Sequence, residues 1–314
     1  MTVPKEAALT SVVIACYDQA HFLGEAIESV LRQTYAHYEI IVADDGSTDN
    51  PVEIASRYPG VRFVTQQNQG SAGTNRNRGF VESKGDYLVF LDADDRLLPD
   101  ALELGVESLN AHPECGFVVG QYALIASDGT PLHITHNDCF EEDHYAAFLR
   151  WEHICQVATL MFRRSVFNSV GGFTNSSAMR GAEDYDISLR IARKFPVYCH
   201  NQRNAEYRLH NVNMSRNVEM MLRSSLAVFR AQREAVKGNK KHEEAYRIGL
   251  GRCLESYGDQ LADKVRAHVR VRGERKQALR GMLALAQLHP RGFLKHACRK
   301  GYCFIFRVKS DFAH

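Results

Sequence analysis

The sequence predicts an α/β fold in roughly its first two thirds, followed by a C-terminal helical region. Short apolar runs typical of strands alternate with segments in which apolar residues recur at helical spacing, which is the pattern of a mostly parallel sheet with helical crossovers. Beyond Asn217 almost every segment has helical periodicity, interrupted only by Pro290. We therefore expect one domain over residues 1–215 and a helical region over residues 216–314.

Four strands are expected in the N-terminal part, over residues 11–15, 39–43, 61–65 and 86–91. Helices are expected between them, over residues 22–33 and 49–58 and in the segment that carries Arg76 and Arg78. In open α/β sheets, ligands bind beyond the carboxyl ends of the strands. Polar residues that follow these strands, although far apart in the sequence, are therefore expected to converge on one crevice.

From about residue 116 the pattern is mixed. Residues 117–125 and 131–135 predict a hairpin that turns at Asp128-Gly129. A further apolar segment, 155–162, leads to a turn at Gly171-Gly172. Residues 182–195 predict a helix with Glu183 and Asp184 in its first turn, where acidic side chains suit the helix dipole.

The strand over residues 86–91 runs directly into Asp92-Ala93-Asp94-Asp95. Carboxylates this close together disfavour joint ionisation unless a cation compensates them. Hard oxygen ligands of this kind suit Mg²⁺ or Mn²⁺. Taken alone, the motif is better explained as a solvated acidic turn, and only the other motifs favour a metal site.

Charge is distributed unevenly along the chain. Residues 216–314 contain 22 lysines and arginines against 9 acidic residues, a formal charge of +13, and the first 215 residues carry −11. The asymmetry suggests different roles for the two parts, with an anionic surface as a candidate partner of the basic one. A helical module with a solvated basic face explains the charge as well.

The eight cysteines show neither CxxC spacing nor a compact framework, so we expect reduced thiols and a reducing compartment. No stretch reaches the roughly 18 apolar residues of a spanning helix, and the N-terminus lacks an apolar signal core. We expect a cytoplasmic protein, with peripheral attachment to the inner face of the cytoplasmic membrane left open.

Together these motifs resemble the family 2 inverting glycosyltransferases, which bind nucleotide sugars with a GT-A fold. The resemblance covers roughly residues 9–216, and its elements stand in the family's order. They are residues 11–18, 44–49, 68–70, 76–79 and 90–95, then Gly171-Gly172-Phe173, Glu183-Asp184 and His210. The spacing between Gly70 and Arg76 is one residue longer than in the family, which leaves both Asn75 and Arg76 as candidates for one role.

The resemblance implies roles for the donor-binding residues. Ala15 and Tyr17 would lie against the nucleotide base, and Asp45 would accept a hydrogen bond from its edge, which favours a UDP-sugar. Within the DxD motif, Asp92 and Ala93 would lie near the ribose. Arg76 would add positive charge near the diphosphate.

The metal and the base are assigned by the same resemblance. Asp94 would coordinate Mn²⁺ or Mg²⁺, with His210 completing the shell and Asp95 supporting it. Asp184 would be the catalytic base, kept ionised by its helix N-terminus, and Glu183 an orienting or acceptor-side residue. Each of four residues also has a structural alternative. Tyr17 could be an aromatic at the edge of the core, and Arg76 a surface arginine. His210 could be a structural histidine, and Asp184 a helix cap. Arg208, Asn213 and Ser215 are expected on a flexible stretch that closes over the donor.

The motifs do not specify the acceptor, for which we expect a carbohydrate or a lipid-linked molecule, and the oligomeric state is left open. The basic stretch from Arg266 to Arg280 lies beside apolar and aromatic residues, a combination typical of helices on anionic membranes. Packing on the catalytic domain or on a second subunit explains the apolar positions too. The alternative function is a non-enzymatic binder of an anionic polymer or membrane. We expect no nucleic-acid partner, because groove-reading elements are absent from the sequence pattern.

Overall fold

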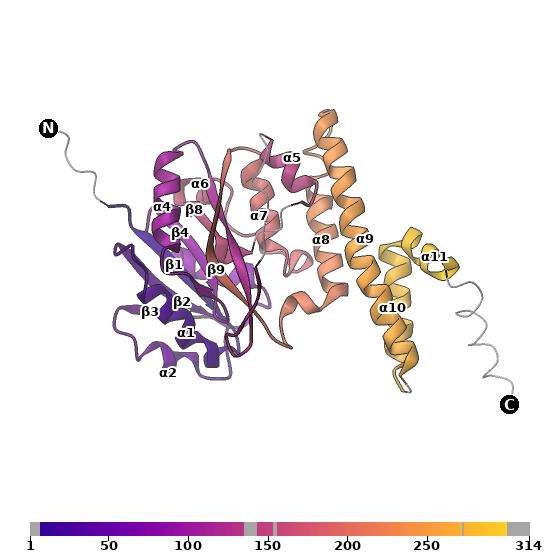
Figure 1. Ribbon diagram of the computed structural model, residues 1–314, viewed down its shortest axis with the longest axis horizontal. Helices are drawn as coiled ribbons and strands as arrows, with labels where there is room; N and C mark the ends of the chain where they lie inside the picture. The colour runs from indigo at the N-terminus through magenta and orange to yellow at the C-terminus, as the bar shows by residue number, and fades with distance from the viewer. Residues whose placement is uncertain (1–6, 135–142, 153–155, 272, 300–314) are drawn as a thin grey trace.

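The structure is a computed structural model that describes residues 7–134, 143–152, 156–271 and 273–299. A mixed β-sheet forms the body of the N-terminal part (Figure 1). Its strands are β1 Thr10–Cys16, β2 Tyr38–Asp44, β3 Val61–Thr65, β4 Tyr87–Asp92, β5 Arg96–Leu97, β6 Phe117–Ala126, β7 Pro131–Ile134, β8 Leu160–Arg163 and β9 Val197–Leu209.

The strands lie in the order β3-β2-β1-β4-β8-β6-β9-β5, with β7 paired to β6. The first four strands are parallel to one another, and β8 runs antiparallel to both of its neighbours. Cys16 lies opposite Asp44 and Ala15 lies opposite Asp92, so the carboxyl ends of β1, β2 and β4 meet at one edge. The four predicted strands and the GT-A-like mixed sheet are confirmed.

Helices flank the sheet and continue beyond it. They are α1 Ala20–Leu31, α2 Pro51–Ala55, α3 Ala72–Glu82, α4 Ala101–Ala111, α5 His144–Leu149, α6 Arg164–Ser169, α7 Glu183–Ala192, α8 Val218–Gln232, α9 Lys240–Arg270, α10 Arg275–Leu288 and α11 Pro290–Arg299. Short 3₁₀ turns are η1 Val157–Thr159, η2 Ser177–Met179 and η3 Met214–Arg216.

The helix predicted over residues 49–58 is shorter than expected. It begins after Asn50, whose φ of 62° is left-handed, and it ends at Ala55. The next backbone N–H groups, of Arg57 and Tyr58, bond three residues back rather than four, so the chain tightens into a turn. The predicted hairpin is confirmed by the antiparallel pairing of β6 with β7, although Thr135 lies outside the described residues. Cys155 does too.

A single hydrophobic cluster joins the sheet to the C-terminal helices. It contains Phe90 of β4, Leu189 of α7, Phe229 of α8 and Leu261 of α9, all almost fully buried. Figure 1 shows α7 between the sheet and α8, with α9 beside α8 and with α10 and α11 farthest from the sheet. The helical character predicted beyond Asn217 is therefore confirmed, and these helices share their core with the sheet.

In the described part of the chain, none of the helices combines the length and apolarity that crossing a membrane requires. Cys16, Cys115, Cys199 and Cys253 are free thiols.

Candidate active site

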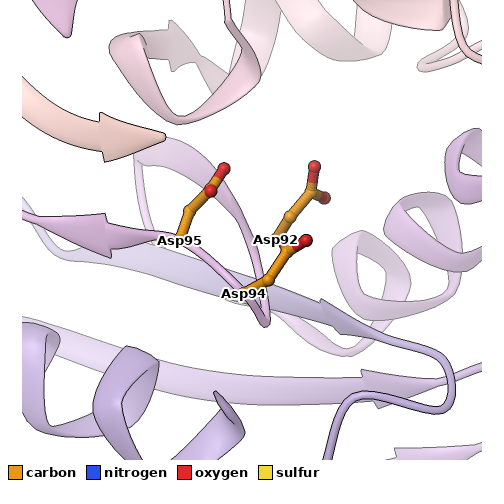
Figure 2. Close-up of side chains that lie close together, drawn as sticks. All are labelled: Asp92, Asp94 and Asp95. Carbon is orange, nitrogen blue, oxygen red and sulfur yellow. The ribbon is translucent and has the colours of Figure 1, made fainter. Parts of the chain in front are cut away.

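The acidic motif lies in the turn that follows β4. Asp92 is the last residue of β4, and Figure 2 shows the side chains of Asp92, Asp94 and Asp95 on the same side of this turn. One carboxylate oxygen from each lies within 4.8 Å of the others. Burial and the neighbouring Asp94 carboxylate raise the pKa values of Asp92 and Asp95, against the opposing effect of nearby arginines. The electrostatic cost inferred from the sequence is thus present in the fold.

Asp94 and His210 lie in direct contact. The Nε2 atom of His210 is 2.8 Å from Oδ2 of Asp94, and both side chains are more than nine-tenths buried. Gln19, the residue before α1, donates its amide N–H to the same oxygen at 2.8 Å. His210 follows β9 and stands beside the ring of Phe22, with 5.4 Å between ring centroids. The fold therefore brings together the two residues assigned to the metal, which are 116 positions apart.

Arg76 forms an ion pair with Asp92. Its Nη2 atom lies 2.6 Å from Oδ1 of Asp92, and the arginine is 6% exposed. The Nε–H group of Arg76 is also buried, and it has no hydrogen-bond partner among the described residues. Asn75 instead points into the sheet, where its amide donates to the carbonyl oxygens of Cys16 and Ala43. Of the two candidates, Arg76 is the one at the acidic turn.

Asp95 is held by groups from two distant segments. Its Oδ1 accepts the backbone N–H of Arg208 at 2.9 Å, and its Oδ2 accepts the amide of Gln156 at 2.5 Å. Because both oxygens already have donors, Asp95 is less available than Asp94 as a ligand. Asp95 instead supports the turn by tying it to Arg208 and Gln156.

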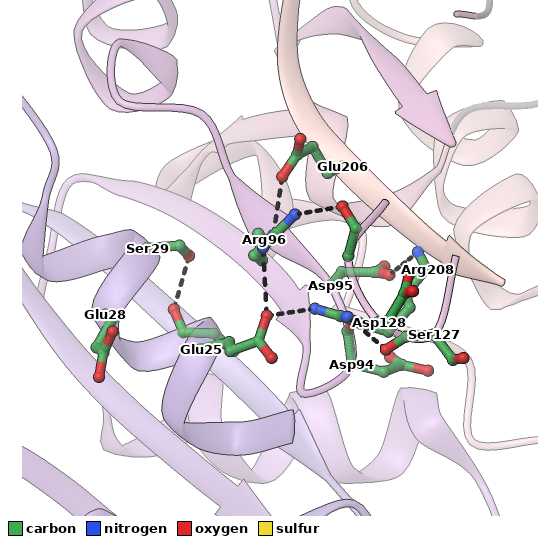
Figure 3. A network of polar contacts seen from close by, with 12 residues as sticks. Glu25, Glu28, Ser29, Asp94, Asp95, Arg96, Ser127, Asp128, Glu206 and Arg208 are labelled. Carbon is green, nitrogen blue, oxygen red and sulfur yellow. Dashed lines mark hydrogen bonds and ion pairs between the residues drawn. The ribbon is translucent and has the colours of Figure 1, made fainter. Parts of the chain in front are cut away.

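Arg208 lies in β9 and is fully buried, so its placement on a flexible stretch over the donor was wrong. Its guanidinium donates to the backbone oxygen of Asp94 at 2.7 Å, to that of Ser127 at 2.9 Å and to the Glu25 carboxylate at 2.7 Å (Figure 3). It also lies over the ring of Phe22, 4.6 Å from its centroid. A buried arginine requires such partners, and here they fix it inside the fold.

Asn213 and Ser215 follow β9. Asn213 is buried and hydrogen-bonds to the backbone of Arg208 and His210, so this turn is closed on itself. Ser215 hydrogen-bonds to the hydroxyl of Tyr207 at 3.0 Å.

Asp184 and Glu183 open α7 and have different surroundings. Glu183 is buried and accepts hydrogen bonds from Ser71 at 3.2 Å and from the backbone N–H of Gly181 at 2.7 Å. The carboxylate of Asp184 accepts the N–H of Tyr185 at 2.7 Å. Burial raises the pKa of Asp184 to about 7, while Arg76 opposes this and Glu183 and Asp92 add to it. Desolvation therefore opposes the ionisation that the helix N-terminus was expected to favour, and the role of Asp184 as the base stays a prediction.

The residues assigned to the nucleotide base follow β1 and β2. Tyr17 is 46% exposed and Ala15 is buried at the end of β1. Asp45 is buried, and its carboxylate accepts hydrogen bonds from the side chain of Gln66 at 2.7 Å and the backbone of Gln69 at 3.1 Å. The carboxylate of the adjacent Asp44 accepts hydrogen bonds from the backbone N–H of Ser47 and from the Thr65 hydroxyl. Ala93, inside the acidic motif, is fully buried.

Gly171 and Gly172 form a turn after α6. Both have left-handed φ values, 78° and 69°, which a side chain would strain. A Cβ on Gly172 would lie 2.7 Å from Oδ1 of Asn77, which bonds the backbone N–H of Phe173. Turn geometry therefore accounts for these glycines.

Three residues of this network were not identified from the sequence: Gln19 and Gln156, which bond the acidic turn, and Glu25, which bonds Arg208. They belong to no motif, and they lie 61 to 183 positions away from their partners. Nothing in a single sequence marks such a side chain.

The donor set fits a hard divalent cation. Asp92, Asp94 and Asp95 each place a carboxylate oxygen within 4.8 Å of the others, and His210 places a ring nitrogen 2.8 Å from Asp94. Asp95 and Arg208 orient this set from behind.

A mixed sheet with an acidic turn at the carboxyl ends of its parallel strands is the arrangement of the GT-A glycosyltransferase folds. The family described as Glycosyl transferase family 2 matches residues 11–171, just over half of the chain. The chain therefore belongs to this family.

Curated relatives agree with this assignment. A putative teichuronic acid biosynthesis glycosyltransferase, TuaG of Bacillus subtilis (strain 168), is 28% identical over 71% of this chain and 87% of its own length. Chondroitin synthase of Escherichia coli is 28% identical over 67% of this chain. The chain spans 30% of that synthase and 36% of an uncharacterised glycosyltransferase of Rickettsia felis.

Two solved structures share the fold. TarS 1-349 of S. aureus, in complex with UDP-GlcNAc, superposes with a TM-score of 0.65 at 15% identity, covering 90% of this chain and 82% of that one. The mannosyltransferase PcManGT of Pyrobaculum calidifontis, in complex with GDP-Man and Mn²⁺, has a TM-score of 0.59 at 18% identity, covering 93% and 86%.

Proposed function

We propose that the protein transfers a sugar from a nucleoside diphosphate donor to an acceptor hydroxyl, with inversion at the anomeric carbon. The contact network at the acidic turn carries the proposal, because it joins Arg76, Asp92, Asp94 and His210 at one edge of the sheet. Asp184 is close enough to Arg76 and Asp92 for all three to affect one another's ionisation. Sugar transfer of this kind needs positive charge beside the leaving diphosphate and a base near the acceptor hydroxyl, and these residues can supply both.

The donor diphosphate would lie beside Arg76 and the acidic turn. The Nε–H group of Arg76, which has no partner among the described residues, would donate to a phosphate oxygen. This hydrogen bond would remove the cost of burying an unsatisfied donor. Asp94 and His210, with Asp92, would hold Mn²⁺ or Mg²⁺, which when bound neutralises charge on the diphosphate. Tyr17 would stack on the base, while Ala15 and Asp45 line it.

The reaction is a single in-line displacement. The acceptor oxygen forms a bond to the anomeric carbon as the bond to the diphosphate breaks, and the diphosphate leaves with the electron pair. Asp184 takes the acceptor proton on its carboxylate. A base with a pKa near 7 suits this task at neutral pH. Glu183 would orient the segment before α7 through Gly181.

We infer a UDP-sugar as the favoured donor, since a carboxylate such as Asp45 can accept the imide N–H of uracil. The solved relative TarS binds UDP-GlcNAc, whereas PcManGT binds GDP-Man. The names of TuaG and chondroitin synthase point to polysaccharide synthesis, so a carbohydrate or lipid-linked acceptor is proposed here too.

Thermal unfolding with a panel of nucleotide sugars, with and without Mn²⁺, tests the donor site. A ligand present at about 100 times its Kd adds about 2.7 kcal/mol to the free energy of unfolding. Asp94→Ala should abolish the Mn²⁺-dependent part of the shift. Asp259→Ala, at an exposed carboxylate of α9, is the matched control and should keep it. A full shift in the Asp94 variant would remove Asp94 from the site.

A further inference from the structure

We propose that the outward side of α10 is a docking surface for an anionic lipid bilayer. This surface, the α10 face, consists of Lys276, Leu279, Arg280 and Leu283, all of them exposed. Their spacing of three and four residues places them on one side of the helix. The opposite side packs inward through small and apolar residues: Ala278, Gly281, Ala284 and Leu285.

Among residues 7–134, 143–152, 156–271 and 273–299, none covers the apolar part of this face. Leu279 is 55% exposed and Leu283 is 62% exposed, and on the next helix Leu294 is 60% exposed. A soluble helix normally turns leucines inward, and α10 already has a separate buried side that satisfies this rule. The outward leucines are therefore open to a partner that the described residues do not supply.

The stretch of sequence that contains these leucines carries charge of one sign. Between Glu274 and Asp311 the sequence contains nine lysines and arginines and no acidic residue. On the α10 face Lys276 and Arg280 flank the leucines, so apolar and basic groups share one surface. Basic groups beside exposed apolar side chains match the headgroup and acyl boundary of an anionic membrane.

Charge also argues against a second copy of this chain as the partner. Two α10 faces packed together would bring Lys276 and Arg280 against the same residues of the other copy, and like charges in contact oppose association. Figure 1 shows α10 and α11 at the end of the molecule farthest from the sheet. Docking there leaves β1 to β4 and the acidic turn clear, so the proposal is independent of the proposed transfer reaction.

Sedimentation of the full chain with vesicles tests the proposal. One set contains phosphatidylcholine alone, and the other contains phosphatidylcholine and phosphatidylglycerol in equal parts, each at low and high salt. We expect binding to the anionic vesicles at low salt that weakens at high salt. Lys276→Gln with Arg280→Gln should lower the affinity about 30-fold, given the attraction of each basic residue to an anionic surface. Leu279→Ser with Leu283→Ser should lower it as well.

The matched control is the double variant Lys240→Gln with Arg247→Gln. It removes two exposed charges near the N-terminal end of α9. We expect it to bind within about threefold of the unchanged protein, because its charges lie outside the α10 face. All variants alter exposed positions, and circular dichroism checks that they fold.

Three results would overturn the proposal. The first is no sedimentation with anionic vesicles at either salt concentration, and the second is an equal loss of affinity in the control pair. The third is a dimer, detected without lipid, that the Leu279 and Leu283 variant dissociates; this would assign the face to a second copy.

Discussion

Replacing Arg208 by methionine tests whether this buried arginine holds the acidic turn in place. Methionine keeps the apolar stem against Phe22 but removes the three hydrogen bonds of the guanidinium. The backbone oxygens of Asp94 and Ser127 then lose their donor inside the fold, at about 1–3 kcal/mol each. Glu25 is 47% exposed, so water can replace its partner at little cost.

We therefore expect Arg208→Met to lower the free energy of unfolding by about 3–5 kcal/mol, in the range seen when one partner of a buried pair is removed. For a chain of this size the melting temperature should fall by roughly 10 °C. The Mn²⁺-dependent stabilisation by the donor should also weaken, since the turn that carries Asp94 loses its support. Calorimetry with and without donor and metal measures both effects.

Arg223 offers a matched control, because it is 44% exposed and pairs with Glu219 on the same helix. Arg223→Met should change the free energy of unfolding by no more than about 0.5 kcal/mol. Arg208→Lys keeps the charge but not the planar fork, so we expect an intermediate loss. Equal melting temperatures for the two methionine variants would refute the stability argument. An unchanged metal-dependent shift in a destabilised Arg208→Met would refute the positioning role.

Three further predictions concern the base and the core. Asp184→Asn should still bind donor, as thermal shifts would show, but should transfer sugar about 10²–10⁴-fold more slowly; near-normal turnover would reject Asp184 as the base. Since burial raises the pKa of Asp184 to about 7, the proton-accepting form is lost below this pH, so kcat/KM should fall as pH drops through about 7. A flat profile between about pH 5 and about pH 8 would contradict this expectation. A Cβ on Gly79 would lie 2.3 Å from Val13 Cγ1, so Gly79→Ala should lower the free energy of unfolding by about 1–3 kcal/mol. Gly251 lies in open space on α9, so Gly251→Ala should raise it by about 0.5–1 kcal/mol. Urea unfolding measures both changes.

Local pattern was enough to predict the sheet strands and the order of the motifs. The strand of β4 is a continuous apolar run because it is buried on both faces, and its end is marked by Asp92. The ordered motifs from β1 to α7 supported the family assignment, which the family match confirms. These features depend on residues near one another in the chain, so a single sequence contains them.

Tertiary structure decided the features that depend on distant partners. The sequence put Arg208 on a mobile stretch, but β9 buries it between Glu25 and the turn of Asp94. It expected Asp184 to be ionised from its helix position, although desolvation in the assembled site raises its pKa. Burial is a property of the packed core, which no local pattern specifies.

The sequence by itself determined the fold class, the family and the set of carboxylates, because strand periodicity and motif order are local. Only the tertiary structure decided which of those groups face one another: Asp94 meets His210, Asp92 meets Arg76, and Asp95 is held from behind. It also showed that α10 turns Leu279 and Leu283 outward. The physical reason is that contact and desolvation arise from the packing of segments far apart in the chain.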